Sequence, residues 1–248
     1  MRQKFFTTES TAMKLIIVLF LMTIAIAVSA KNKPEVKPAD LTPEQVEASY
    51  TQSIEKRVAD ILTALDFKDL QKQGRVHDEL IAQYRSLRAW HDANDPKPAA
   101  VKSATTAPTT SAAAFSSDAR NQLKGLHQQF LDNLARDITP EQIEIVKDKM
   151  TYNKVQVTFN GYCEIIQNLT DIEKLHITQL LKEAREEAMD GGSSEEKSAI
   201  FKKYKGKIAN YLSANGHDVA GDYKSWGERQ KAKSQTPAIN KTNTSAKE

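Results

Sequence analysis

The sequence predicts an all-α fold: a compact bundle of about six to eight helices built from helical hairpins, with a low-complexity insertion. Three observations support this prediction. Apolar residues recur at steps of three and four along most of the chain, as in amphipathic helices. Several such segments begin with a helix-capping sequence and end at Gly or Asn. Only residues 151–159 alternate as a strand would, and this short, isolated stretch is interpreted as a loop or extended segment.

Residues 1–30 are predicted to be a secretory signal peptide. Lys14 precedes an apolar run from Leu15 to Val28, and small residues follow up to Ala30. The run is shorter than the roughly 20 apolar residues that cross a bilayer. We therefore expect cleavage after Ala30 and an exported protein, periplasmic or secreted, with no stable membrane anchor after cleavage. Met1 and Met13 are both suitable start codons.

The composition narrows the classes of function. The chain carries a net charge of +3, most of it in the signal segment, so the mature part is close to neutral. Together with export, this gives no reason to expect a nucleic-acid partner. The only cysteine, Cys163, precludes an internal disulfide and is predicted to be a buried structural residue. The 5 histidines show no zinc spacing, and no phosphate-loop or hydrolase motif occurs, so we expect no metal and no cofactor.

Residues 31–95 are predicted to form an N-terminal helical hairpin. Thr42 is a suitable N-cap and Pro43 suits the first position of a helix that ends at Leu65. A second apolar stripe predicts a helix over residues 74–91. Residues 96–116, rich in Ala, Thr and Pro, are interpreted as a linker or insertion because they offer little to bury.

Residues 117–233 are predicted to form the C-terminal helical part of the same domain. Helices are expected to begin near residue 118, in ITPEQIE (residues 138–144), at Thr170 and after Ser193, which forms a predicted capping box with Glu196. Asn215-Gly216 ends the fourth of these helices and precedes a last one. The polar tail, residues 234–248, is predicted to be disordered.

The sequence LTPEQVE near the start of the first helix returns as ITPEQIE. Duplication of a helical hairpin would explain the repeat, and so would independent selection of good helix starts. The highly charged segment LLKEAREEAMD is interpreted as a solvated helix face, with Arg185 as a residue that can turn inward.

Gly206 stands in the middle of the predicted helix KYKGKIANYLSA. A glycine there costs roughly 1 kcal/mol relative to alanine. Our favoured explanation is that another helix crosses closely at Gly206. The alternative is that the glycine leaves room for a ligand beside Tyr204, Lys207 and Asn210. A tyrosine ring, a lysine and an amide suit an acidic saccharide.

A second group of candidate residues lies in RAWHDAND, at the end of a predicted helix. Arg88 and His91 are candidate ligand-binding residues there, and His91 is a candidate general base with Asp92 nearby. A solvated helix end is the simpler interpretation. The acidic residues of this segment lack the glycine and closing glutamate of a calcium loop. No catalytic residue is assigned from the sequence.

Four distinctive motifs follow one another along the chain: RVHDELIAQYRSLRAWHD, MTYNKVQVTFNGYCEIIQNLT, AREEAMDGGSSEEK and KYKGKIANYLSANGHD. By these motifs the chain resembles a bacterial family of secreted proteins known as domain of unknown function 3826. The resemblance implies an exported protein linked to plant-polysaccharide, particularly pectin, degradation, but it supplies no active site. Where that family usually has arginine, this chain has Lys207, which weakens any bidentate carboxylate clamp. The paired LTPEQ-type starts also resemble small periplasmic helical chaperones.

The sequence therefore predicts an exported accessory or binding protein in plant (pectic) polysaccharide processing. Its expected partner is an acidic oligosaccharide or a protein of a glycan-degrading system. One alternative is an enzyme, a lyase or hydrolase of uronate-containing oligosaccharides, with Tyr204 or His91 as the base. Another is a periplasmic chaperone-like interaction protein.

Overall fold

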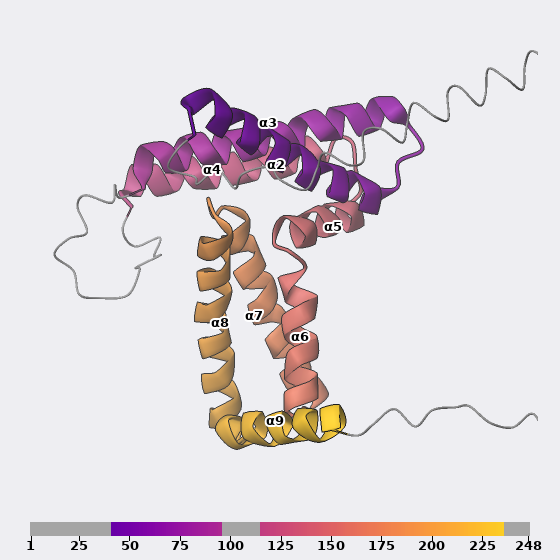
Figure 1. Ribbon diagram of the computed structural model, residues 1–248, viewed down its shortest axis with the longest axis vertical. Coiled ribbons are helices and arrows are strands. Elements are labelled where there is room, and N and C mark those ends of the chain that lie inside the picture. Colours follow the sequence, from indigo (N-terminus) through magenta and orange to yellow (C-terminus); the bar gives the residue numbers. More distant parts are fainter. Residues whose placement is uncertain (1–40, 96–114, 236–248) are drawn as a thin grey trace, which may run out of the picture. The chain divides into compact units, whose positions relative to one another are not determined.

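The computed structural model describes residues 41–95 and 115–235, which form eight α helices and no strand. The predicted all-α class is therefore confirmed (Figure 1). The chain divides into two units, residues 1–50 and 51–248, and the tertiary contacts given below lie within the second. The helices are α2 (Pro43–Leu65), α3 (Leu70–Asn94), α4 (Ser117–Leu134), α5 (Pro140–Met150), α6 (Lys154–Ile165), α7 (Asp171–Met189), α8 (Ser194–Ala214) and α9 (Val219–Gln235).

Three sequence predictions fall wholly or mostly outside the described residues. They are the signal peptide, the linker and the tail. Of the linker, only Phe115 and Ser116 are described, and Ser116 is the N-cap of α4. Of the tail, only residues 234–235 are described, and they belong to α9. None of the described helices is both long and apolar enough to cross a membrane.

The repeated LTPEQ-type sequences form the same local structure at two helix starts. At α2 the Thr42 backbone N–H donates to the Gln45 side chain at 2.9 Å, and the Gln45 N–H donates back to the Thr42 hydroxyl at 3.3 Å. Thr139 and Gln142 form the same capping box before α5. The pattern satisfies backbone donors that a helix start leaves unpaired. Good capping chemistry thus accounts for the repeated residues, and duplication stays a prediction.

The interpretation of residues 151–159 as a loop or extended segment is wrong, because helix α6 covers most of them. Val155 and Phe159 are four residues apart and pack on the same hydrophobic core, whereas Val157 between them is 66% exposed. The apparent alternation is therefore part of a helical stripe. Cys163 lies on α6 as expected, but it is only half-buried.

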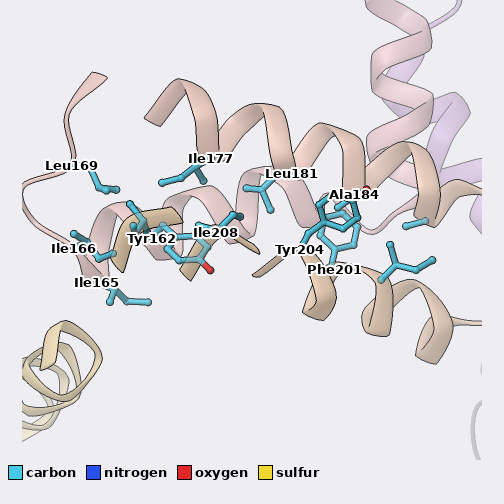
Figure 2. Close-up of a cluster of buried hydrophobic side chains, with 13 residues drawn as sticks. Tyr162, Ile165, Ile166, Leu169, Ile177, Leu181, Ala184, Phe201, Tyr204 and Ile208 are labelled. Atoms are coloured by element: carbon cyan, nitrogen blue, oxygen red, sulfur yellow. The ribbon is translucent and has the colours of Figure 1, made fainter. Parts of the chain in front are cut away.

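Helices α6, α7 and α8 run side by side, and α9 crosses one end of them (Figure 1). Their shared core is drawn in Figure 2, where side chains from all three helices meet. On α7, Ile177, Leu181 and Ala184 follow each other at helical spacing and are fully buried. Burial of each large apolar side chain stabilises the fold by about 1.5–3 kcal/mol. Because these side chains point into the core, the opposite faces of α7 and α8 point away from it.

Helices α3 and α4 form a second packed pair. Leu80 on α3 and Phe130 on α4 have no exposed surface. Near the start of α4, the Trp90 indole N–H donates to the Ala119 carbonyl at 3.1 Å, and the Trp90 ring meets the Phe115 ring edge-on at 4.8 Å. These contacts fix the first turns of α4 against α3.

Candidate functional site

Tyr204, Lys207 and Asn210, three of the predicted ligand-binding residues, lie on α8. Tyr204 is 7% exposed and its ring belongs to the core in Figure 2. Lys207 and Asn210 are exposed. The Lys207 ammonium lies 3.9 Å from the centroid of the Tyr204 ring, a cation–π contact. Tyr204 therefore supports a lysine and does not offer an open ring face for a sugar to stack on.

The favoured explanation for Gly206 is wrong. A Cβ atom added at Gly206 would meet no heavy atom within 4 Å, so none of the described helices crosses closely there. The residue is exposed on α8. Packing gives no reason for glycine at this position.

Arg88 and His91 lie near the end of α3. Arg88 faces Asp92, with Nε 3.7 Å from the carboxylate. His91 is 6% exposed, with Nε2 2.8 Å from the Asp190 backbone oxygen and Nδ1 3.0 Å from the Asp95 carboxylate. Both ring nitrogens thus face acceptors within the protein, and the predicted His91–Asp92 pair is replaced by His91–Asp95.

The structure does not bring these two groups of predicted residues together. His91 contacts the connection between α7 and α8, where the ring approaches Gly192. Tyr204 lies about 12 residues further along the chain, at least two turns into α8. The two groups are therefore not parts of one small site.

The end of α7 is a point at which three other helices converge. His91 from α3 contacts the Asp190 backbone oxygen, and His127 from α4 contacts the Asp190 carboxylate with Nδ1 at 2.8 Å. Lys197 from α8 donates to the Met189 carbonyl at 3.2 Å. Basic groups are favourable at a helix C-terminus, where carbonyls lack partners and the dipole is negative. We call these five residues the α7 joint.

Lys197 is the most enclosed cation of the joint. It is 3% exposed, and this burial lowers its pKa to about 8. Desolvation disfavours the charged ammonium, and the nearby Asp190 only partly offsets that effect. Its ammonium donates to a carbonyl at the end of α7, which makes Lys197 a structural cap of that helix.

Position 192 requires glycine because the His91 side chain of α3 packs against it. A Cβ atom there would lie 2.7 Å from Cγ of His91, closer than real Cβ contacts allow. Its backbone N–H donates to the Glu196 carboxylate at 2.8 Å. The Glu196 N–H donates to the Ser193 hydroxyl at 3.0 Å, so only this half of the predicted Ser193–Glu196 capping box is formed.

A network of paired charges continues from the joint along α7. Hydrogen bonding to Asp190 and to Glu186 raises the pKa of His127 to about 9. Burial opposes ionisation of Glu186, but hydrogen bonds from His127 and Lys147 prevail and lower its pKa to about 2. Lys147 Nζ lies 2.9 Å from the Glu186 carboxylate. The carboxylate of Glu186 is thus held ionised.

Arg185 is the buried centre of this network. The residue is 2% exposed. Its guanidinium donates hydrogen bonds to Asp148 at 2.8 Å and to Glu144 at 2.7 Å, both on α5. Arg185 therefore turns inward, which is the exception that the prediction of a solvated face for LLKEAREEAMD allowed. The prediction is right for Lys182 of the same segment, whose side chain is 56% exposed.

Beside the network lies a cavity of about 370 Å³ between α4, α7 and the start of α8. Its apolar surface comes from Phe115, Leu123 and Ile200. Helix α4 adds a basic stripe of Arg120, Lys124 and His127, at steps of four and three. Helix α7 adds Glu186, Glu187 and Asp190 opposite them, and α8 adds Glu196.

Most carboxylates of the cavity already have partners. Glu186 and Asp190 contact His127, and Glu187 accepts two hydrogen bonds from Lys203 at 2.7 and 2.8 Å. Within the described ranges, Lys124 has no ion-pair partner and its side chain is exposed at the cavity. The cavity thus combines an apolar surface, carboxylate acceptors and an available cation. This chemistry suits a ligand with an apolar face, hydroxyl donors and an anionic group.

Sequence reasoning missed the residues of α4 and, apart from His91, the residues of the joint. His127 and Lys124 stand in an ordinary amphipathic stripe, and nothing in sequence spacing links them to Asp190, more than 60 residues later. The double glycine Gly191-Gly192 is the available signal in the sequence, because a pair of glycines allows another part of the chain to approach closely. In the part of the chain that the structure describes, no cluster of three or more His, Cys, Asp or Glu side chains could hold a metal ion.

The fold and the cavity together define an all-α protein in which α4, α7 and α8 line an open cavity with charged walls. The chain belongs to the family described as "Protein of unknown function (DUF3826)", which matches residues 51–232. The match begins within α2 and ends within α9, so it includes the joint, the cavity and α8. The resemblance to this family is confirmed. No curated protein matches the chain.

Proposed function

We propose that the protein is an exported accessory component of plant-polysaccharide processing and that it binds a uronate-containing oligosaccharide in the cavity between α4, α7 and α8. The observation that supports this most is the position of Lys124. It stands at a partly apolar cavity whose carboxylates have other partners. A uronate carboxylate would pair with Lys124, and sugar hydroxyls would donate to carboxylates such as Glu196. The apolar face of the sugar would lie on Ile200 or Phe115.

Binding is favoured over catalysis by the state of Tyr204. Burial, with a contribution from Glu187, raises the pKa of Tyr204 to about 12, so its phenolate is scarce at neutral pH. A lyase needs a base that is readily deprotonated. His91, the other candidate base, contacts Asp95 and the Asp190 carbonyl instead of an open cavity. The geometry therefore supports a binding site more than an active site.

The binding proposal is tested by titration calorimetry of the purified chain with digalacturonate and with a neutral disaccharide of the same size. We expect binding of the acidic sugar only. Lys124→Ala removes the proposed cation and should weaken binding about tenfold, which corresponds to one charge-assisted contact. Lys205→Ala, an exposed lysine of α8 outside the cavity, is the matched control and should leave affinity unchanged.

Two results would overturn the binding proposal. One is equally weak binding of the acidic and the neutral disaccharide. The other is the same affinity in Lys124→Ala as in the parent chain. Formation of an unsaturated uronate, seen as new ultraviolet absorbance during incubation, would instead make the protein a lyase.

Export is proposed from the apolar run and the small residues before Lys31. Expression of the full chain in a Gram-negative host, followed by mass analysis of the periplasmic fraction, tests it. We expect a mature protein that begins at Lys31. A product that retains Leu15–Val28 would contradict this part of the proposal.

A further inference from the structure

One face of α8 leads directly out of the cavity. Glu196 and Ile200 line the cavity, and Lys203, Lys207 and Asn210 follow at steps of three and four. Residues at these steps lie on one side of a helix. From Ile200 to Asn210 the face extends about 15 Å along the helix axis. The cavity and this lysine face are therefore one continuous strip.

The junction between cavity and lysine face is a specific contact. Glu187 belongs to the cavity wall and accepts both hydrogen bonds from Lys203, at 2.7 and 2.8 Å. The Lys203 ammonium lies 5.2 Å from the centroid of the Tyr204 ring, and that of Lys207 lies 3.9 Å from it. The buried ring thus holds two ammonium groups on the same side of α8. This arrangement restricts lysine side chains that are otherwise mobile.

The lysine face is open and positively charged. Lys207 and Asn210 are exposed, and among the described residues Lys207 has no ion-pair partner. The buried side of α8, which includes Ile208, is turned into the core. Repeated ammonium groups beside a cavity are complementary to a chain that carries repeated carboxylates. A single sugar in the cavity would not span this face, which extends about 15 Å along α8 from Ile200 to Asn210.

We infer that the binding site is extended: the cavity receives one end of a polyuronate chain, and Lys203, Lys207 and Asn210 bind the sugars that follow it. The inference rests on the proposed function and specifies its ligand as a polymer segment instead of a mono- or disaccharide. Tyr204 acts as a positioning residue because it contacts the two lysines and does not contact the ligand.

The experiment compares affinity for digalacturonate and hexagalacturonate by titration calorimetry. In the parent chain the hexamer should bind about tenfold more tightly than the dimer, the increment of one further charge-assisted contact. Lys207→Ala should remove that increment and leave affinity for the dimer unchanged. Lys205→Ala is the matched control, because it removes the same charge at a position about 200° around the helix from Lys203. It should change neither affinity.

The outcomes separate this inference from the proposed function. If the dimer binds but the hexamer binds no more tightly, or if Lys207→Ala and Lys205→Ala behave alike, the cavity acts alone and the extended site is overturned. If neither uronate binds, the proposed function fails and the inference fails with it. If heparin or vesicles of anionic lipid bind as tightly as the hexamer, with the same loss in Lys207→Ala, the face is a general polyanion surface and the inference is overturned.

Discussion

The connection between α7 and α8 and the middle of α8 each contain a glycine, but only one of these glycines is required by packing. At the α7 joint, Gly192 is needed because the His91 ring, from a helix about a hundred residues earlier, occupies the space of a Cβ atom. In the middle of α8, Gly206 has no neighbour that a Cβ atom would meet. The glycine that is unusual in the sequence, within a helix, is the one that packing does not require. Glycine is required at position 192 because a side chain from a distant part of the sequence packs against it, and the local sequence does not reveal such a contact.

The same two regions differ in how their charges are used. At the joint and its network, Arg185 and Lys197 are buried, and charged groups of α4, α5 and α7 contact one another. On the lysine face of α8 the charged groups are exposed. Substitutions in the first region should therefore change the free energy of unfolding, whereas substitutions in the second should change ligand affinity and leave stability nearly unaltered.

The largest effect is expected for Arg185→Met. The change keeps an apolar stem but removes a buried guanidinium that donates to Glu144 and Asp148. Breaking a buried ion pair costs about 3–5 kcal/mol when the remaining charge is buried. The remaining carboxylates here have side-chain exposures of 43% and 39%, so we expect about 3 kcal/mol. Urea unfolding monitored by circular dichroism measures it.

The matched control for Arg185 is Lys182→Met on the same helix. Its side chain is 56% exposed and lies 3.7 Å from Glu144, so it forms a surface pair. Such pairs contribute about 0–1 kcal/mol. Equal effects of the two substitutions would mean that the α5–α7 network does not stabilise the fold more than ordinary surface charges do.

His127 should make the stability of the protein depend on pH. Its pKa is raised from 6.5 to about 9 by Asp190 and Glu186, so its contribution is complete below about pH 6.5. The contribution is lost as the pH rises through about 9, when the folded state also releases the proton. The shift corresponds to up to about 3 kcal/mol. The free energy of unfolding of the parent chain minus that of His127→Gln should fall over this window.

Subtracting the unfolding free energy of His127→Gln from that of the parent chain removes the pH dependence that Lys197 contributes. The pKa of Lys197 is lowered to about 8, so its own contribution changes in the same range with the opposite sign, and it is common to both proteins. His77→Gln is a control at a more exposed ion pair, whose histidine side chain is 34% exposed. A difference that stays flat between pH 6 and 10 would contradict a charged His127 in the joint.

Much of the fold follows from the sequence, whereas the joint does not. Helix starts were predictable because capping is local: Thr139 and Thr170 satisfy donors within three residues of themselves. The error at α6 arose because an apolar alternation of a few residues fits both a strand and a helix until its partner surface is known. The joint depends on residues from four helices, and no spacing within one helix predicts which of them meet.

The lysine face is an intermediate case. The spacing of Lys203, Lys207 and Asn210 predicts a shared face, since helix geometry fixes it, and all three residues are exposed on α8. The role of Tyr204 was not predictable, because its ring lies on the boundary between that face and the core. The cavity residue Lys124 carried no signal at all. Its position at the cavity depends on how α4 packs.

Gly192→Ala should destabilise the protein by about 1–3 kcal/mol, the usual range for an overpacked contact. The added methyl group meets the His91 ring at 2.7 Å, and that ring is held by Asp95 and the Asp190 carbonyl. A double-mutant cycle gives the cause. In a His91→Ala background the same change should have little effect, because the clash is removed. If Gly192→Ala destabilises the His91→Ala variant as much as the parent chain, the His91 ring is not the reason that position 192 requires glycine.

The smallest effect, and the only one of opposite sign, is expected for Gly206→Ala. Alanine favours a helix over glycine by roughly 1 kcal/mol, and the new methyl group would meet nothing within 4 Å. The midpoint of thermal unfolding should therefore rise by about 2–4 °C. Gly125→Ala is the matched control, since Gly125 is also exposed inside a helix with no neighbour at its Cβ position, and it should show a similar gain.

A loss of stability in Gly206→Ala alone would require a contact at α8 that this structure lacks. If instead the gain appears and hexagalacturonate binds less tightly, the polymer passes over Gly206 itself, and the lysine face is wider than the side of α8 that carries Lys203 and Lys207.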